Sequence, residues 1–149
     1  MQMKGEFIVK NLEETTKLAK DYLASLVGRA GGDGKAVVVG LSGHLGSGKT
    51  SFTKIVAKEL GIQEHITSPT FVLMKKYPLK NFPWNNLIHI DAYRLEKKQD
   101  LNALDFDNLQ KENNLIFIEW PENVGLETSE RISFEVIDTK ANLRRVIIK

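Results

Sequence analysis

The sequence predicts an α/β fold, a three-layer sandwich in which helices cover a mostly parallel, mixed sheet, as a single domain over residues 1–149. Two observations predict it. Short apolar runs typical of buried strands alternate along the chain with segments of helical periodicity. One of these runs leads directly into a glycine-rich loop and a second helical segment, an order typical of a nucleotide-binding unit. A length of 149 residues suits one domain with its own core.

The first 30 residues predict a short strand and an amphipathic helix. Residues 7–9 form an apolar run. Asn11 can cap a helix through its side chain, and Glu14, three residues later, completes the spacing of a capping box. Apolar residues then recur at helical intervals through Val27, and the glycines at 28, 31, 32 and 34 end the helix in a loop.

Residues 36–60 predict a strand, a phosphate-binding loop and a helix. The run AVVVGL at 36–41 is typical of a buried strand, and GHLGSGKT at 43–50 fits the pattern Gly, four residues, Gly-Lys-Thr. Glycines let the backbone wrap an anion, and the following helix, predicted at 51–60, directs its positive end there. Lys49 would neutralise the outer phosphates, and the Thr50 hydroxyl would bind Mg²⁺. We therefore predict a P-loop NTPase-like sandwich; the alternative is a glycine turn without a ligand.

The remaining apolar runs predict the rest of the sheet. Strands are expected at residues 71–74, 87–90, 115–118, 132–136 and 146–148, the last two as closing strands that could form a hairpin. Residues 75–86 contain two prolines and predict a loop or hairpin, and residues 100–113 predict one or two helical turns.

Two acidic residues stand at the ends of predicted strands. Asp91 follows the run at 87–90, and Glu119 follows the run at 115–118. An NTPase needs an acidic group to complete the Mg²⁺ shell or to position water, and in parallel sheets such groups lie at the carboxyl ends of strands. Each acid alone could be a solvated boundary residue, and the spacing does not say which one touches the metal.

Composition narrows the class of protein. Hydrophobic residues make up 42% and charged residues 27%, which is an ordinary globular balance. The absence of cysteine excludes disulfides, thiolate zinc sites and cysteine nucleophiles. A net charge of +2 does not suggest a dedicated nucleic-acid binder. No apolar run approaches the roughly 18 residues of a membrane span, and no apolar signal region begins the chain, so we expect a cytoplasmic protein without membrane contact.

Four motifs together resemble one family. They are GHLGSGKT at 43–50, SPTF at 68–71, HIDAYRL at 89–95 and EWPE at 119–122. Their order and separations are similar to those of TsaE, the small P-loop ATPase of bacterial tRNA threonylcarbamoyladenosine biosynthesis, over the chain from about Phe7 onward. The first motif is generic, whereas its combination with the other three is specific. The family usually has Asp where this chain has His44.

The resemblance implies an ATPase that uses ATP and Mg²⁺ and acts with two partners, TsaB and TsaD. TsaD transfers the threonylcarbamoyl group onto adenosine 37 of tRNA, so contact with tRNA would be indirect. Hydrolysis by the TsaE-like subunit would reset the complex between turnovers. By position, Lys49 and Thr50 bind phosphate and Mg²⁺, Glu119 is the second protein ligand to Mg²⁺, and Asp91 supports hydrolysis or its coupling.

The resemblance also implies the remaining contacts with the nucleotide. Trp120 lies beside the site, Thr15 lies near the base, and residues 68–71 form a switch-like loop. The expected contacts of the loop itself are Leu45, Gly46, Ser47, Gly48, Lys49 and Thr50.

The sequence leaves three alternative functions to consider, and a few further residues have a predicted role. A small-molecule kinase is the main alternative, although the sequence shows no arginine-rich lid. The Asn-Lys-x-Asp pattern that specifies guanine in GTPases is absent, so ATP is favoured over GTP. A module that binds ATP without hydrolysing it is a further alternative. We interpret His89 as a strand residue rather than a base. Arg94 is a candidate arginine finger in cis, and Arg144 and Arg145 are interpreted as solvated surface.

Overall fold

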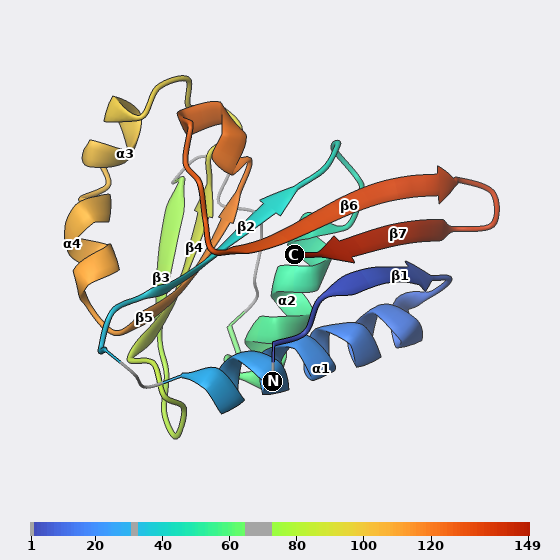
Figure 1. The fold of residues 1–149 in the computed structure, drawn as a ribbon, viewed down its shortest axis with the longest axis horizontal. Coiled ribbons are helices and arrows are strands. Elements are labelled where there is room, and N and C mark those ends of the chain that lie inside the picture. Colours follow the sequence, from blue (N-terminus) through green and yellow to red (C-terminus); the bar gives the residue numbers. More distant parts are fainter. Residues whose placement is uncertain (1, 31–32, 65–72) are drawn as a thin grey trace.

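A computed structural model describes residues 2–30, 33–64 and 73–149, and its centre is one seven-stranded sheet (Figure 1). The order of strands across the sheet is β1-β7-β6-β2-β5-β4-β3. The strands are β1 (Gly5–Val9), β2 (Val37–Ser42), β3 (Met74–Pro78), β4 (Asn86–Asp91), β5 (Asn114–Glu119), β6 (Glu130–Asp138) and β7 (Leu143–Ile148).

The middle of the sheet is parallel and its edges are antiparallel. β2 pairs in parallel with both β5 and β6, and β4 pairs in parallel with β5. β3 runs antiparallel to β4 at one edge, while β6, β7 and β1 run antiparallel to one another at the other. The prediction of a mostly parallel, mixed sheet is confirmed, and so is the closing hairpin.

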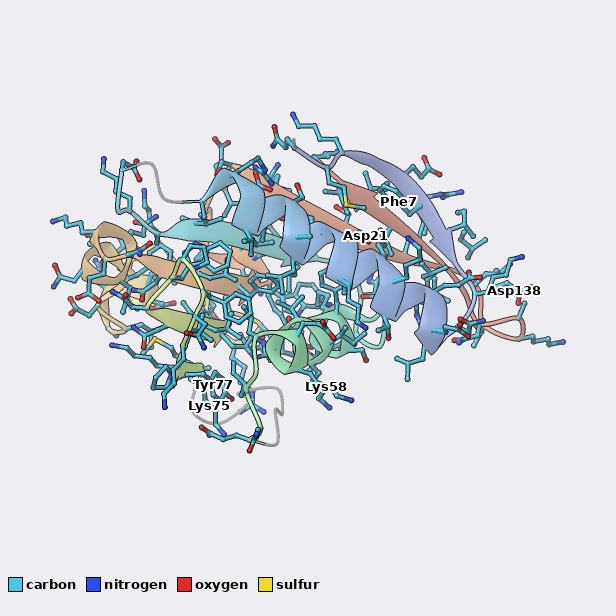
Figure 2. The ribbon with its side chains drawn as sticks, turned by 90° about the horizontal axis from the view of Figure 1, so that it is seen from below. Phe7, Asp21, Lys58, Lys75, Tyr77 and Asp138 are labelled. Atoms are coloured by element: carbon cyan, nitrogen blue, oxygen red, sulfur yellow. The ribbon has the colours of Figure 1, made fainter. Side chains whose placement is uncertain are left out.

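Helices cover both faces of the sheet and make the three predicted layers. α1 (Leu12–Arg29) and α2 (Lys49–Glu59) lie side by side across one face, the face that Figure 2 shows from below. α3 (Gln99–Asn102), α4 (Phe106–Lys111) and the 3₁₀ turn η1 (Pro121–Val124) pack on the other face. Asn11 caps α1 as predicted, its Oδ1 accepting a hydrogen bond from the Glu14 amide at 2.8 Å. Among the described residues, no helix is long and apolar enough to span a membrane.

The alternation of strand side chains divides the core into two halves. In β5, Leu115 and Phe117 pack with the α1 and α2 residues, whereas Ile116 and Ile118 pack with α3 and α4. All four are completely buried. A strand covered on both faces must be apolar at every position, and the unbroken run at 115–118 reflects this.

The predictions differ from the structure mainly at the edge strand β3. This strand extends to Pro78, through residues that were predicted as a loop or hairpin. Lys75, Lys76 and a proline are tolerated there because an edge strand has one side without a partner. The 3₁₀ turn η1 was not predicted, and α2 begins two residues earlier than expected, at Lys49. The predicted strand at 71–74 and the SPTF motif lie largely or wholly outside the described residues.

A buried polar cluster joins α1 to the start of β6. The Glu130 carboxylate is 4% exposed and accepts hydrogen bonds from the Tyr22 hydroxyl at 3.0 Å and from both Arg29 amino groups at 3.1 and 3.2 Å. Burial, followed by the nearby Glu130 charge, raises the pKa of Tyr22, so this hydroxyl stays a donor. The cluster fixes the position of α1 against the sheet.

We expect Glu130→Ala to lower the free energy of unfolding by about 2–3 kcal/mol, because it leaves a buried hydroxyl and a partly buried cation without their acceptor. Urea denaturation followed by circular dichroism measures the change. Glu135→Ala is the matched control. Glu135 pairs with Arg145 on the surface and its side chain is 60% exposed, so its loss should cost less than about 1 kcal/mol. Equal losses for the two variants would contradict this account of the cluster.

Candidate active site

A cavity of about 580 Å³ opens at the carboxyl edge of the parallel strands, around the loop that joins β2 to α2. This is the edge at which α/β proteins bind ligands. The cavity is lined by the described residues that were predicted to contact the nucleotide or Mg²⁺, namely Thr15, Leu45, Gly46, Ser47, Gly48, Lys49, Thr50, Asp91, Glu119 and Trp120. The predicted switch-like loop at 68–71 lies outside the described residues. The structure therefore brings together residues that come from α1, the loop, α2, β4 and β5.

All three glycines of the loop have a positive φ, and Gly43 and Gly48 have the largest values. Gly43 has a φ of +146°, and a Cβ placed on it would lie 2.5 Å from the Phe134 carbonyl oxygen and 2.7 Å from Ser47 Oγ. Gly48 caps the N-terminus of α2 with a φ of +116°, a conformation that L side chains rarely adopt. These two glycines let the loop turn tightly, so that the first turn of α2 faces the cavity.

Lys49 lies across the floor of the cavity. Its side chain is 4% exposed and its ammonium donates hydrogen bonds to the carbonyl of Gly43 and, at 3.1 Å, to that of His44. Burial lowers the pKa of Lys49 below its ordinary value, while the negative charges of Glu119, Asp91 and Glu122 oppose this shift. An anion in the cavity would favour the charged form of this lysine, so the residue suits a phosphate ligand.

Thr50 and Glu119 meet at the end of the cavity nearest β5. The Thr50 hydroxyl donates to the Glu119 carboxylate, with distances of 3.0 Å to Oε1 and 3.2 Å to Oε2. The register of β2 against β5 places Leu41 beside Glu119, directly before the loop. A hydroxyl and a carboxylate at this separation are the two protein groups that the sequence predicted for Mg²⁺.

His89 is a third member of this group, and sequence reasoning did not identify it. It is a strand residue, as interpreted, and is completely buried in β4. Its Nε2 lies 2.7 Å from Glu119 Oε2, and among the described residues its Nδ1 has no partner. Because an ionised carboxylate only accepts hydrogen bonds, Nε2 is then the nitrogen that carries the hydrogen. His89 thus holds one oxygen of Glu119 from the side away from the cavity.

Asp91 and Glu119 lie side by side at the ends of β4 and β5, where they are paired in register. Asp91 is 8% exposed, and its Oδ1 accepts a hydrogen bond from the Tyr93 amide at 3.0 Å. The prediction that both acids would share one edge of the sheet is confirmed. Glu119 contacts Thr50, which makes it the candidate for the metal, and Asp91 lines the same cavity beside it.

Trp120 covers Lys49 from the β5 side. The ammonium of Lys49 lies 4.3 Å from the centroid of the Trp120 ring, close enough for a cation–π interaction. Trp120 has a φ of +61°, an unusual conformation for a tryptophan, and its amide donates to the carbonyl of Leu41 at 3.0 Å. Tyr93 packs on Trp120, with 5.2 Å between the ring centroids, and forms the rim of the cavity.

The residues present fit Mg²⁺ with a nucleotide. Ser47 Oγ is buried in the loop and has no hydrogen-bond partner within the part of the chain that the structure describes, so a polar ligand there would satisfy it. The same part of the chain holds no cluster of three or more His, Cys, Asp or Glu side chains suited to a metal. Mg²⁺ needs none, since it is commonly bound through one or two protein oxygens, phosphates and water.

Two residues outside the predicted set have unexpected positions. His44, which stands where the TsaE pattern usually has Asp, is exposed and does not line the cavity. Arg144, which was interpreted as solvated surface, lines the cavity opposite Glu119. Only the sheet order brings Arg144 to the loop, and a contact between residues so distant in the sequence leaves no local signal.

The fold is that of a three-layer, P-loop NTPase-like α/β sandwich around a mixed seven-stranded sheet. The family model described as "Threonylcarbamoyl adenosine biosynthesis protein TsaE" matches residues 9–147. The chain belongs to the TsaE family, as its four motifs predicted.

Individual relatives agree with this membership. A Streptomyces coelicolor protein named tRNA threonylcarbamoyladenosine biosynthesis protein TsaE is 38% identical over 118 residues, which cover 74% of this chain and 78% of the relative. A Treponema pallidum protein of the same name is 40% identical and covers 71% of this chain and 74% of its own length. The crystal structure of YdiB from Bacillus subtilis is similar with a TM-score of 0.70 at 26% identity, covering 99% of this chain and 86% of YdiB.

Proposed function

We propose that this chain binds and hydrolyses Mg-ATP in the cytoplasm, and that hydrolysis drives turnover of a TsaB–TsaD complex that modifies adenosine 37 of tRNA. Membership of the TsaE family supports the pathway. The observation that carries the ATPase assignment is the contact between Thr50 and Glu119 beside the buried ammonium of Lys49, all within one cavity.

The chain's own residues would act on the nucleotide by position and charge. Lys49 and the amides at the N-terminus of α2 would hold the phosphates and stabilise the negative charge that develops during phosphoryl transfer. Thr50 and Glu119 would hold Mg²⁺, which when bound would supply positive charge to the outer phosphates. Asp91 faces the same space and would orient the attacking water or couple hydrolysis to a partner.

Steady-state release of phosphate from ATP, with and without purified TsaB–TsaD complex, tests the proposal. We expect slow turnover by the isolated chain and faster turnover with the partners, and a pull-down of TsaB and TsaD that depends on ATP. Turnover that does not change when the partners are added would contradict coupling. Transfer of phosphate to a metabolite instead of water would identify a kinase.

A further inference from the structure

Two neighbouring arginines of β7 have different surroundings. Arg145 forms ion pairs with Glu6 at 2.6 Å and Glu135 at 2.9 Å. Successive residues of a strand point to opposite faces, so Arg144 faces the other way. Within residues 2–30, 33–64 and 73–149, Arg144 has no ion pair with a carboxylate, although the side chain is partly buried.

The guanidinium of Arg144 lies against the phosphate-binding loop. Its Nη2 is 3.4 Å from the carbonyl oxygen of Gly46, and its Nη1 donates to Asn142 Oδ1 at 2.9 Å. A Cβ placed on Gly48 would lie 3.7 Å from Arg144 Cδ. The Nε atom is buried and has no hydrogen-bond partner among the described residues. A cation in this position has donor capacity that the described part of the chain leaves unused.

The sheet order determines which end of a nucleotide Arg144 can reach. β2, which leads into the loop, lies between β5 on one side and β6 and β7 on the other. Glu119 and Asp91 lie on the β5 side. Mg²⁺ is expected on this side, at Thr50 and Glu119, and so are the outer phosphates. The cavity continues on the β7 side past Arg144 to Val146 and to Leu12 and Thr15 of α1. A nucleotide whose outer phosphates lie at Thr50 must extend its α-phosphate and nucleoside in this direction.

We infer that Arg144 is a nucleotide-binding residue that contacts the α-phosphate end of ATP and ADP. This inference rests on the proposed function, since it specifies one contact of the same site. Arg144 interacts with the part of the nucleotide that hydrolysis leaves unchanged. It therefore stabilises substrate, transition state and product alike, unlike an arginine finger, which acts on the γ-phosphate.

The test compares Arg144→Gln with Arg145→Gln by titration of ADP and of a non-hydrolysable ATP analogue, together with steady-state kinetics. We expect Arg144→Gln to weaken both ligands by a similar factor of about 30, because a charge-assisted hydrogen bond is lost. KM for ATP should rise in proportion while kcat stays within about twofold. Arg145→Gln should leave both affinities unchanged, and Arg144→Lys should restore part of the loss.

Four outcomes are decisive. Nucleotide affinity of Arg144→Gln equal to that of the unmodified chain would overturn the inference, provided that the unmodified chain binds ADP. A fall in kcat without a change in ADP affinity would also overturn it and would identify Arg144 as an arginine finger. If the unmodified chain binds no adenine nucleotide, the proposed function itself fails. If Arg144 contacts the phosphate by charge, the difference in nucleotide affinity between Arg144→Gln and the unmodified chain should shrink as ionic strength rises. A difference in affinity that does not depend on salt would contradict a charge contact.

Discussion

Lys49→Ala is expected to lower the affinity for ADP and ATP by at least about 100-fold and to abolish measurable turnover. The buried ammonium lies at the floor of the cavity and would supply more than one charge-assisted hydrogen bond to the phosphates. Losing about 3 kcal/mol of such contacts corresponds to a factor of about 100 in the dissociation constant. Isothermal titration calorimetry with ADP measures the change directly.

Lys54→Ala is the matched control for Lys49→Ala. Lys54 belongs to the same helix but is exposed, so its replacement removes one positive charge from α2 without altering the cavity. It should bind ADP as the unmodified chain does. Full ADP affinity and turnover in Lys49→Ala, with circular dichroism showing that the variant is folded, would mean that the loop does not bind phosphate.

Glu119→Gln is expected to lower Mg²⁺-dependent hydrolysis by about 100-fold or more while leaving Mg²⁺-free binding of ADP within a few-fold. The amide keeps the shape of the side chain but loses the charge, and carboxylates are preferred ligands of Mg²⁺. The contacts with Thr50 and His89 also change, since an amide presents one acceptor oxygen and one donor nitrogen in place of two acceptors. Phosphate release measured across a Mg²⁺ titration separates weaker metal binding from slower chemistry.

Glu127→Gln serves as the control for this second variant, because Glu127 is exposed and does not line the cavity. It removes the same charge from the region after β5 and should leave the Mg²⁺ dependence unchanged. An unaltered Mg²⁺ dependence in Glu119→Gln would contradict a metal-binding role for Glu119 and would favour Asp91, the other acid at this edge of the sheet, as the metal ligand.

The sequence predicted the parts of the fold that have strong local signals. The continuous apolar run at 115–118 identified β5, because a strand covered on both faces is apolar at successive positions. The run at 87–90 identified β4 although it contains one polar residue, His89. The carboxyl ends of these strands then gave the positions of Asp91 and Glu119 at one edge. The glycine pattern fixed the loop, because only a few sequences can form that turn before a helix.

The parts that sequence reasoning missed depend on contacts between distant residues. His89 alternates with two isoleucines in β4 and resembles an ordinary core position, yet its partner Glu119 lies on the neighbouring strand. Arg144 lies in β7 just after a polar turn, and only the position of β7 in the sheet brings it to the loop. Strand β3 was underestimated since its lysines and proline are typical of loops as well as of edge strands.

The pairing of β1 with β7 determines when the sheet can be completed during synthesis. Gly5 is opposite Ile148, so the first strand of the sheet has its hydrogen-bonding partner only after the chain has been made as far as β7. Such a distant pairing forms late and slowly, because a long loop must close before the contact stabilises it. We therefore expect a nascent chain lacking β7 to present an unpaired β1 and the open edge of β6, a state suited to chaperone binding. The same chain would also lack the wall of the cavity that carries Arg144 and Val146.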